Sequence, residues 1–188
     1  MPKVPTTMPT AAVDVARSPG LSDLLTVEAI RIGASAEDWR AAVRLAGDAL
    51  AASGATAPPY TDEMIATVEQ LGPYIVIAPG IALAHSRPSA AVRHAGISLV
   101  TLSRPVDFGH RTNDPVRLVV GLAAPDEDGH VTALSTLAEF LADEASRDGL
   151  MGATSPEEVM RLVVAFERRQ AGDMRPPTTE GIASEERT

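Results

Sequence analysis

The chain has 188 residues, enough for one domain with a sizeable core, and 45% of them are hydrophobic, which indicates a globular protein. Its formal net charge of -9 argues against a general nucleic-acid-binding protein and against docking to an anionic membrane surface. The absence of cysteine excludes disulfides, thiol catalysis and cysteine-based zinc or iron–sulfur sites.

The two ends of the chain differ from its middle. Residues 1–20 contain four prolines and predict a flexible extension, whereas residues 172–188 are polar and predict a disordered tail. The folded unit is therefore expected to span residues 21–171. There is no run of about 18 apolar residues and no apolar segment behind Lys3, so we expect no membrane span, no signal peptide and a cytoplasmic location.

The N-terminal half of the folded unit alternates strand-like and helix-like patterns. A short helix is expected near Leu21–Leu25, and a strand at Ala29–Ile32. Apolar residues at three- and four-residue spacing then predict a helix over residues 36–53, with Ser35 as its N-cap and Gly54 just past its end. A second helix is expected over residues 60–71, capped by Thr61, with Met64, Ile65, Val68 and Leu71 facing inward.

The second half continues this alternation. Strands are expected at residues 74–78, 81–84, 96–102 and 116–124, and the last is apolar enough to be buried on both faces. Helices are expected at residues 88–94, 130–145 and 155–170, the first of them opened by Pro88. Helices that alternate with buried strands predict an α/β fold, in which a mixed sheet is covered by helices on both faces.

The strongest chemical signal is a histidine at the end of a short apolar strand. An apolar run passes through a Pro-Gly turn into a second apolar run, which ends on His85 and is followed by Arg87 and Pro88. The backbone there should be rigid, and a neutral imidazole is a good nucleophile near neutral pH. The alternative is a hydrogen-bonded structural histidine. We expect phosphoryl transfer at His85, with Arg87 as the neighbouring cation.

A second histidine, His130, starts a predicted helix. Free N–H groups and the positive end of the helix dipole favour a phosphate there, so His130 either donates a hydrogen bond to phosphoryl oxygens or is a simple surface residue. His110 lies in a turn-rich stretch and either lines the same surface or is structural, and His94 is expected to be structural or exposed. The histidines show no metal-binding spacing, so we expect no metal and no cofactor.

Several segments together resemble one family. The run Gly72-Pro-Tyr-Ile-Val-Ile-Ala-Pro-Gly-Ile-Ala-Leu-Ala-His85-Ser-Arg-Pro resembles the active-site segment of phosphotransferase-system (PTS) enzyme IIA domains of the mannitol–fructose type, EIIA type 2, closest to the ascorbate-specific branch. The resemblance continues through Gly96-Ile-Ser-Leu, Pro105-Val-Asp-Phe-Gly-His, Asn113-Asp-Pro-Val, Leu118-Val-Val-Gly-Leu-Ala-Ala and His130-Val-Thr-Ala-Leu-Ser-Thr-Leu-Ala. It covers about residues 22–168, and the order and spacing of the blocks make it specific.

The resemblance implies a fold, a reaction and partners. The family fold is a mixed sheet flanked by helices. His85 matches the histidine that accepts a phosphoryl group from the phosphocarrier protein HPr as a tele-phosphohistidine, and His130 matches a second histidine that stabilises this group. The phosphoryl group then passes to a cysteine of enzyme IIB and on to a sugar carried by the membrane enzyme IIC. The implied activity is that of a phosphotransferase in phosphoenolpyruvate-dependent sugar uptake, with no nucleic-acid partner.

One departure from the family pattern concerns the charge that faces the phosphate. The mannitol branch carries an arginine on the helix before the active-site strand, whereas residues 66–68 here are Ala-Thr-Val. Arg87 is the nearest replacement in sequence, and His110 is a second phosphate-binding candidate. A regulatory relative that signals its phosphorylation state to a protein partner stays open as an alternative, and so does a homodimer. The residues expected to form an apolar docking patch around the histidine are Ile81, Leu83 and Pro88.

Overall fold

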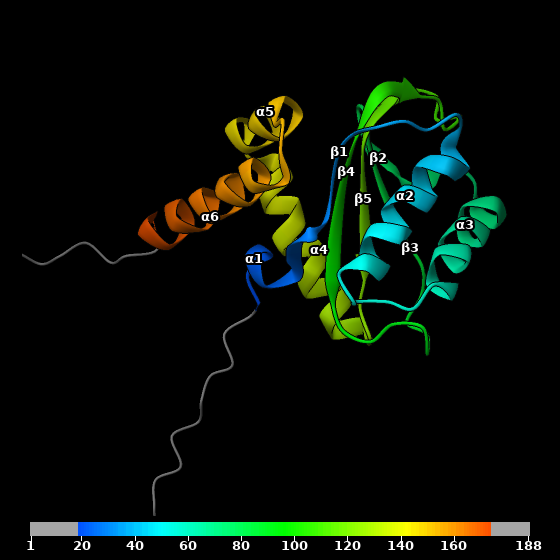
Figure 1. Cartoon of the computed structure of the whole chain (residues 1–188), viewed down its shortest axis with the longest axis horizontal. Helices are drawn as coiled ribbons and strands as arrows, with labels where there is room; N and C mark the ends of the chain where they lie inside the picture. The colour runs from blue at the N-terminus through cyan, green and yellow to red at the C-terminus, as the bar shows by residue number, and fades with distance from the viewer. Residues whose placement is uncertain (1–18, 174–188) are drawn as a thin grey trace, which may run out of the picture.

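The computed structural model describes residues 19–173 (Figure 1). The predicted extension at residues 1–20 and the predicted tail at residues 172–188 therefore lie outside the described residues, except for two residues at each boundary. At the C-terminal boundary, the last helix continues to Asp173, two residues beyond the predicted end of the folded unit.

A five-stranded mixed sheet forms the centre of the fold. The strands are β1 (Leu25–Ala34), β2 (Val76–Ala78), β3 (Ile81–His85), β4 (Gly96–Val106) and β5 (Val116–Ala123). Their order across the sheet is β1-β4-β5-β3-β2. The β1–β4 and β3–β5 pairs are parallel, whereas β4–β5 and β2–β3 are antiparallel. The predicted α/β class with a mixed sheet is confirmed.

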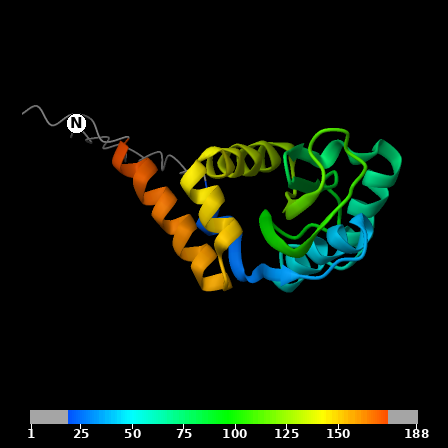
Figure 2. The ribbon, with the colours of Figure 1, turned by 90° about the horizontal axis from the view of Figure 1, so that it is seen from above.

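Helices cover both faces of this sheet (Figure 1). On one face lie α2 (Trp39–Ala52) and α3 (Pro59–Leu71), and on the other lie α1 (Leu21–Leu24), α4 (Glu127–Ala142), α5 (Glu144–Gly152) and α6 (Pro156–Asp173). Each face has its own hydrophobic core, built mainly from Ala, Val, Leu and Ile side chains. Figure 2 shows α6 extending beyond the sheet.

Strand β3 contributes alternate side chains to these two cores, and this alternation positions the site. Ala82 and Ala84 belong to the core under α2 and α3, whereas Ile81 and Leu83 belong to the core under α4 and α6. Successive side chains of a strand point to opposite faces. The next two residues therefore diverge: His85 points to the α4 side, and the following residue points to the α3 side.

The predicted helix at residues 88–94 is wrong, since this segment runs as turns and an isolated bridge between Val92 and Thr56. The Ala57 N–H donates to the Ala91 carbonyl, and the Arg93 N–H donates to the Ala55 carbonyl. A single helical turn gains few hydrogen bonds for the dihedral angles that it fixes. Pairing with residues 55–57 satisfies these backbone groups instead.

Other helix boundaries differ from the predictions because a different residue caps the helix. Helix α2 begins at Trp39, since Asp38 rather than Ser35 accepts the N–H of Ala41 at 2.8 Å. The predicted helix at residues 130–145 is two helices, because Asp143 ends α4 and caps α5 through the N–H of Ser146. Helix α3 begins at Pro59, so Thr61 lies inside its first turn and is not its cap.

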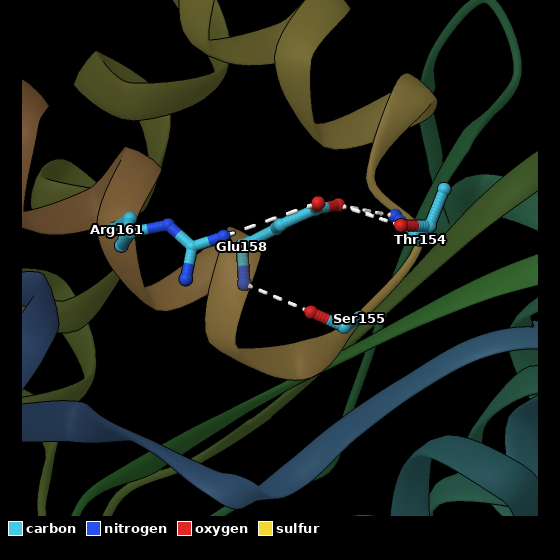
Figure 3. A network of polar contacts seen from close by, with 4 residues as sticks. All are labelled: Thr154, Ser155, Glu158 and Arg161. Atoms are coloured by element: carbon cyan, nitrogen blue, oxygen red, sulfur yellow. Dashed lines mark hydrogen bonds and ion pairs between the residues drawn. The ribbon is translucent and has the colours of Figure 1, made fainter.

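The start of α6 agrees with the sequence pattern Ser-Pro-Glu-Glu. Ser155 accepts a hydrogen bond from the Glu158 N–H, and the Glu158 carboxylate accepts one from the N–H and one from the hydroxyl of Thr154 (Figure 3). Arg161 lies 3.9 Å from the same carboxylate. This reciprocal arrangement satisfies N–H groups that a helix start leaves without partners.

Candidate active site

His85 is the last residue of β3, and its backbone partner across the sheet is Leu122 of β5. Its Nδ1 atom lies 3.0 Å from the carbonyl oxygen of Leu83. A carbonyl oxygen can only accept, so Nδ1 carries the hydrogen of this bond. In the neutral ring the lone pair therefore resides on Nε2, and Nε2 is the nitrogen left for chemistry.

His130 enters the same site from α4. The centroids of the His85 and His130 rings are 5.3 Å apart, with an angle of 51° between the ring planes. Burial lowers the pKa of His130 below its ordinary value, and the nearby charge of His85 lowers this pKa further. A neutral His130 has one N–H to donate and one nitrogen to accept.

A cavity of about 430 Å³ contains both histidines. It lies between the end of α3, the end of β3 and the first turns of α4, and its wall includes Tyr74, whose ring meets the His85 ring edge-on at 6.0 Å. Leu71 and Val131 also line it and are 65% and 61% exposed. The cavity is thus an open, largely apolar depression around two imidazoles.

The start of α4 brings the His130 side chain to the cavity. The helix begins at Glu127, three residues before the predicted start, and the N-cap Asp126 accepts the Gly129 N–H at 2.7 Å. The His130 N–H donates to the Asp126 carbonyl at 3.1 Å. These two amides therefore already have partners, and His130 lines the cavity.

Arg87 lines the cavity and is exposed, and within residues 19–173 it forms no ion pair. The structure does not bring His110 to this cavity. Its loop packs near the start of β3, where the Gly80 N–H donates to the Asn113 carbonyl. There His110 Nδ1 accepts the Asn113 N–H at 3.1 Å, so His110 stabilises a turn. The structure therefore gives no support to the predicted phosphate-binding role of His110 at this cavity.

Tyr60 of α3 holds the chain directly after His85. Its hydroxyl accepts the Ser86 N–H at 3.1 Å, and its single hydrogen is shared between the carbonyl oxygens of Leu122 and Ser86, at 2.9 and 3.2 Å. The side chain is fully buried, and burial raises the pKa of Tyr60 to about 12. The sequence gives no signal for this contact beyond an apolar position at the start of α3.

Within residues 19–173, no helix is both long and apolar enough to cross a lipid bilayer. In the same range, no cluster of three or more His, Asp or Glu side chains is arranged to hold a metal ion.

Comparison with known proteins identifies the family. Residues 23–165 match the family described as "Phosphoenolpyruvate-dependent sugar phosphotransferase system, EIIA 2". The chain belongs to this family. The "Ascorbate-specific PTS system EIIA component" of Escherichia coli K12 is 39% identical to this EIIA domain over 137 residues, which is 72% of this chain and 89% of the relative. The Salmonella typhimurium protein of the same name is 39% identical over 135 residues, 71% of this chain and 88% of the relative.

Solved structures agree with this assignment. The solution structure of the mannitol-specific cryptic phosphotransferase enzyme IIA of Escherichia coli is 30% identical, with a TM-score of 0.69 over 77% of this chain and 98% of that one. The mannitol enzyme IIA in its complex with phosphorylated enzyme IIB from Escherichia coli is 30% identical, with a TM-score of 0.65 over 76% and 99%. The family resemblance found in the sequence is confirmed, and this EIIA domain is a phosphotransferase-system component.

The Tyr60 contact gives a stability prediction. Tyr60→Phe keeps the buried ring but leaves the Ser86 N–H and the Leu122 carbonyl without their partner, so we expect the free energy of unfolding to fall by about 1–3 kcal/mol. Chemical denaturation measures this change. Tyr74→Phe is the matched control, because Tyr74 is 42% exposed, and should change the value by less than about 0.5 kcal/mol. Equal effects of the two substitutions would contradict the assigned role of Tyr60.

The lowered pKa of His130 predicts how stability depends on pH. The unfolded chain protonates this residue near pH 6.5, whereas the folded EIIA domain protonates it only at lower pH. The unfolded state therefore binds more protons in this window, and stability falls as the pH falls below 6.5. Denaturation of the wild type and of His130→Gln at pH 5.5 and 7.5 tests this prediction. The variant should lose less stability on acidification, and an identical loss would be incompatible with a depressed pKa.

Proposed function

We propose that this EIIA component accepts a phosphoryl group from the phosphohistidine of HPr on His85 and passes it to a cysteine of an ascorbate-type enzyme IIB. One observation carries the assignment of the accepting atom: the 3.0 Å bond between Nδ1 of His85 and the Leu83 carbonyl leaves Nε2 free in an open cavity. The names of the relatives support ascorbate as the sugar of the pathway. Because phosphoenolpyruvate is a metabolite of the cytoplasm, the relay operates there.

The transfer itself exchanges one N–P bond for another. The Nε2 lone pair of His85 attacks the phosphorus in line with the donor nitrogen of HPr, whose N–P bond breaks and which keeps the electron pair. The Nδ1–H bond to Leu83 stays in place, so the ring needs no proton transfer. In the second step the thiolate of enzyme IIB attacks phosphorus, and the electron pair of the broken bond returns to Nε2.

His130 stabilises the phosphoryl oxygens in both steps. Its ring lies beside that of His85, and its lowered pKa keeps it neutral near pH 7. A neutral imidazole donates one hydrogen bond to an equatorial oxygen without adding a full charge. Arg87 supplies positive charge at the mouth of the cavity, where its exposed side chain meets each incoming partner.

The surface around the cavity suits two partners that bind in turn. Leu71, Tyr74 and Val131 are all more than 40% exposed and surround the histidines. Pro88 lines the cavity as expected, whereas Ile81 and Leu83 are buried in the core and take no part in docking. The complex of the Escherichia coli mannitol enzyme IIA with phosphorylated enzyme IIB supports enzyme IIB as a partner here.

A two-stage labelling experiment tests the proposed relay. The chain is first incubated with enzyme I, HPr and labelled phosphoenolpyruvate, and then with an ascorbate-type enzyme IIB. We expect label on the chain in the first stage and on the enzyme IIB cysteine in the second. A chain that takes no label contradicts the relay. A labelled chain that never passes its label to enzyme IIB favours the regulatory alternative.

A further inference from the structure

Two hydroxyl groups line the active-site cavity opposite the imidazoles. Ser86 follows His85 and points to the α3 side of the sheet, where its Oγ lies 3.1 Å from Oγ1 of Thr67. Both residues line the cavity. Because the alternation of β3 continues into the residue after it, the cavity has an imidazole wall from β3 and α4 and a hydroxyl wall from Ser86 and α3.

The hydrogen bonds of the two hydroxyls fix which of them is the donor. Thr67 Oγ1 donates its single hydrogen to the Glu63 carbonyl at 2.8 Å. In the 3.1 Å contact, Ser86 is therefore the donor and Thr67 the acceptor. The Ser86 backbone is held on both sides by the Tyr60 hydroxyl, so the rotation of the Ser86 side chain is the remaining freedom.

We propose that Ser86 donates its hydroxyl hydrogen to the phosphoryl group on His85 and that Thr67 orients Ser86 for this bond. The inference rests on the proposed function. A phosphoryl oxygen is charged, and a hydrogen bond to a charged acceptor is about twice as strong as one between neutral groups. Ser86 therefore turns from Thr67 to the phosphoryl oxygen once His85 is phosphorylated.

Thr67 has an alternative hydrogen-bond partner, so this rearrangement leaves neither hydroxyl without a partner. Its hydroxyl can turn from the Glu63 carbonyl to Oγ of Ser86, which gives a chain of hydrogen bonds from Thr67 through Ser86 to the phosphate. The Glu63 carbonyl keeps the helical bond from the Thr67 N–H, four residues along α3. Ser86 thus contacts the transferred group directly, whereas Thr67 is a positioning residue that acts through Ser86.

The equilibrium between the chain and phosphorylated HPr tests this inference. Ser86→Ala should lower the equilibrium constant for phosphorylation about tenfold, because it removes a hydrogen bond to a charged group. Thr67→Val should lower it about threefold, and Thr67→Ser should restore it. The double variant should be no worse than Ser86→Ala alone, since Thr67 acts only through Ser86. The phosphorus-31 chemical shift of the phosphohistidine should also move in Ser86→Ala.

Thr136→Val is the matched control. Thr136 makes the same kind of bond to the carbonyl four residues earlier, at 3.1 Å from Thr132, but it does not line the cavity. It should leave the equilibrium unchanged. The inference is overturned if Ser86→Ala is phosphorylated on His85 to the wild-type extent with an unchanged phosphorus-31 shift. A wild-type chain that takes no phosphate would instead reject the proposed function itself.

Discussion

His85→Ala is expected to reduce phosphorylation by HPr to background, a loss of more than about a thousandfold. Nε2 of His85 is the nitrogen left free by the Nδ1 bond to Leu83, and its replacement removes the atom that we propose bonds to phosphorus. We do not expect His130 to substitute for it, because its ring lies on α4, with its centroid 5.3 Å from that of the His85 ring. The measurement is incorporation of acid-labile label from phosphoenolpyruvate through enzyme I and HPr.

His94→Ala is the control for this substitution. His94 is exposed, and its Nδ1 also lies close to a backbone carbonyl, at 2.9 Å from Ala95. It does not line the active-site cavity, so its removal should leave labelling unchanged. Labelling of His85→Ala at the wild-type level would show that another residue carries the phosphoryl group.

His130→Ala is expected to give a chain that still accepts phosphate but passes it to enzyme IIB about a hundredfold more slowly. In the proposed mechanism, the imidazole beside His85 stabilises charge that develops on the phosphoryl oxygens during transfer. At equilibrium the variant still becomes phosphorylated, because His85 and its bond to Leu83 are intact. Rapid-quench measurement of label passing from the phosphorylated chain to enzyme IIB gives the rate.

His130→Gln separates hydrogen bonding from the loss of side-chain volume. A glutamine amide donates as a neutral imidazole does, so this variant should recover part of the rate. Unchanged transfer by His130→Ala would remove His130 from the reaction, whatever the glutamine variant does.

The sequence predicted the sheet and the position of His85 because both follow from local patterns. The apolar runs on either side of the Pro-Gly turn became β2 and β3, and the second run ends on His85. Helix ends were harder to predict, since several residues competed as caps. Asp126 caps α4, which therefore starts before the predicted residue and has His130 in its first turn. Asp143 is both the C-cap of α4 and the N-cap of α5, so one predicted helix is two helices.

A residue that periodicity assigned to the core became part of the site. Leu71 was predicted to face inward, yet it is exposed and lines the cavity together with the exposed Val131. The last turn of α3 and the first turns of α4 border this cavity, so a side chain there meets open space instead of the sheet. Helical periodicity specifies a face of a helix but not where the neighbouring sheet ends.

The hydroxyl contacts could not be predicted because they join residues that are distant in sequence. Tyr60 and Thr67 reach Ser86 from α3, and neither belongs to a recognisable motif. The sequence raised the question of which group on this helix faces the phosphate in place of an arginine. The structure places Thr67 in that region with its hydroxyl bonded to Ser86, which motivates the inference that neutral donors act beside Arg87.

We propose above that Nε2 of His85 carries the phosphoryl group. Nuclear magnetic resonance of the uniformly nitrogen-15-labelled chain, phosphorylated by HPr, tests it directly through the ring nitrogen shifts and their coupling to phosphorus. We expect a single phosphohistidine with phosphorus bonded to Nε2 of His85 and with the Nδ1 hydrogen still donated to the Leu83 carbonyl. Phosphorus on Nδ1 of His85, or on any other residue, would contradict it.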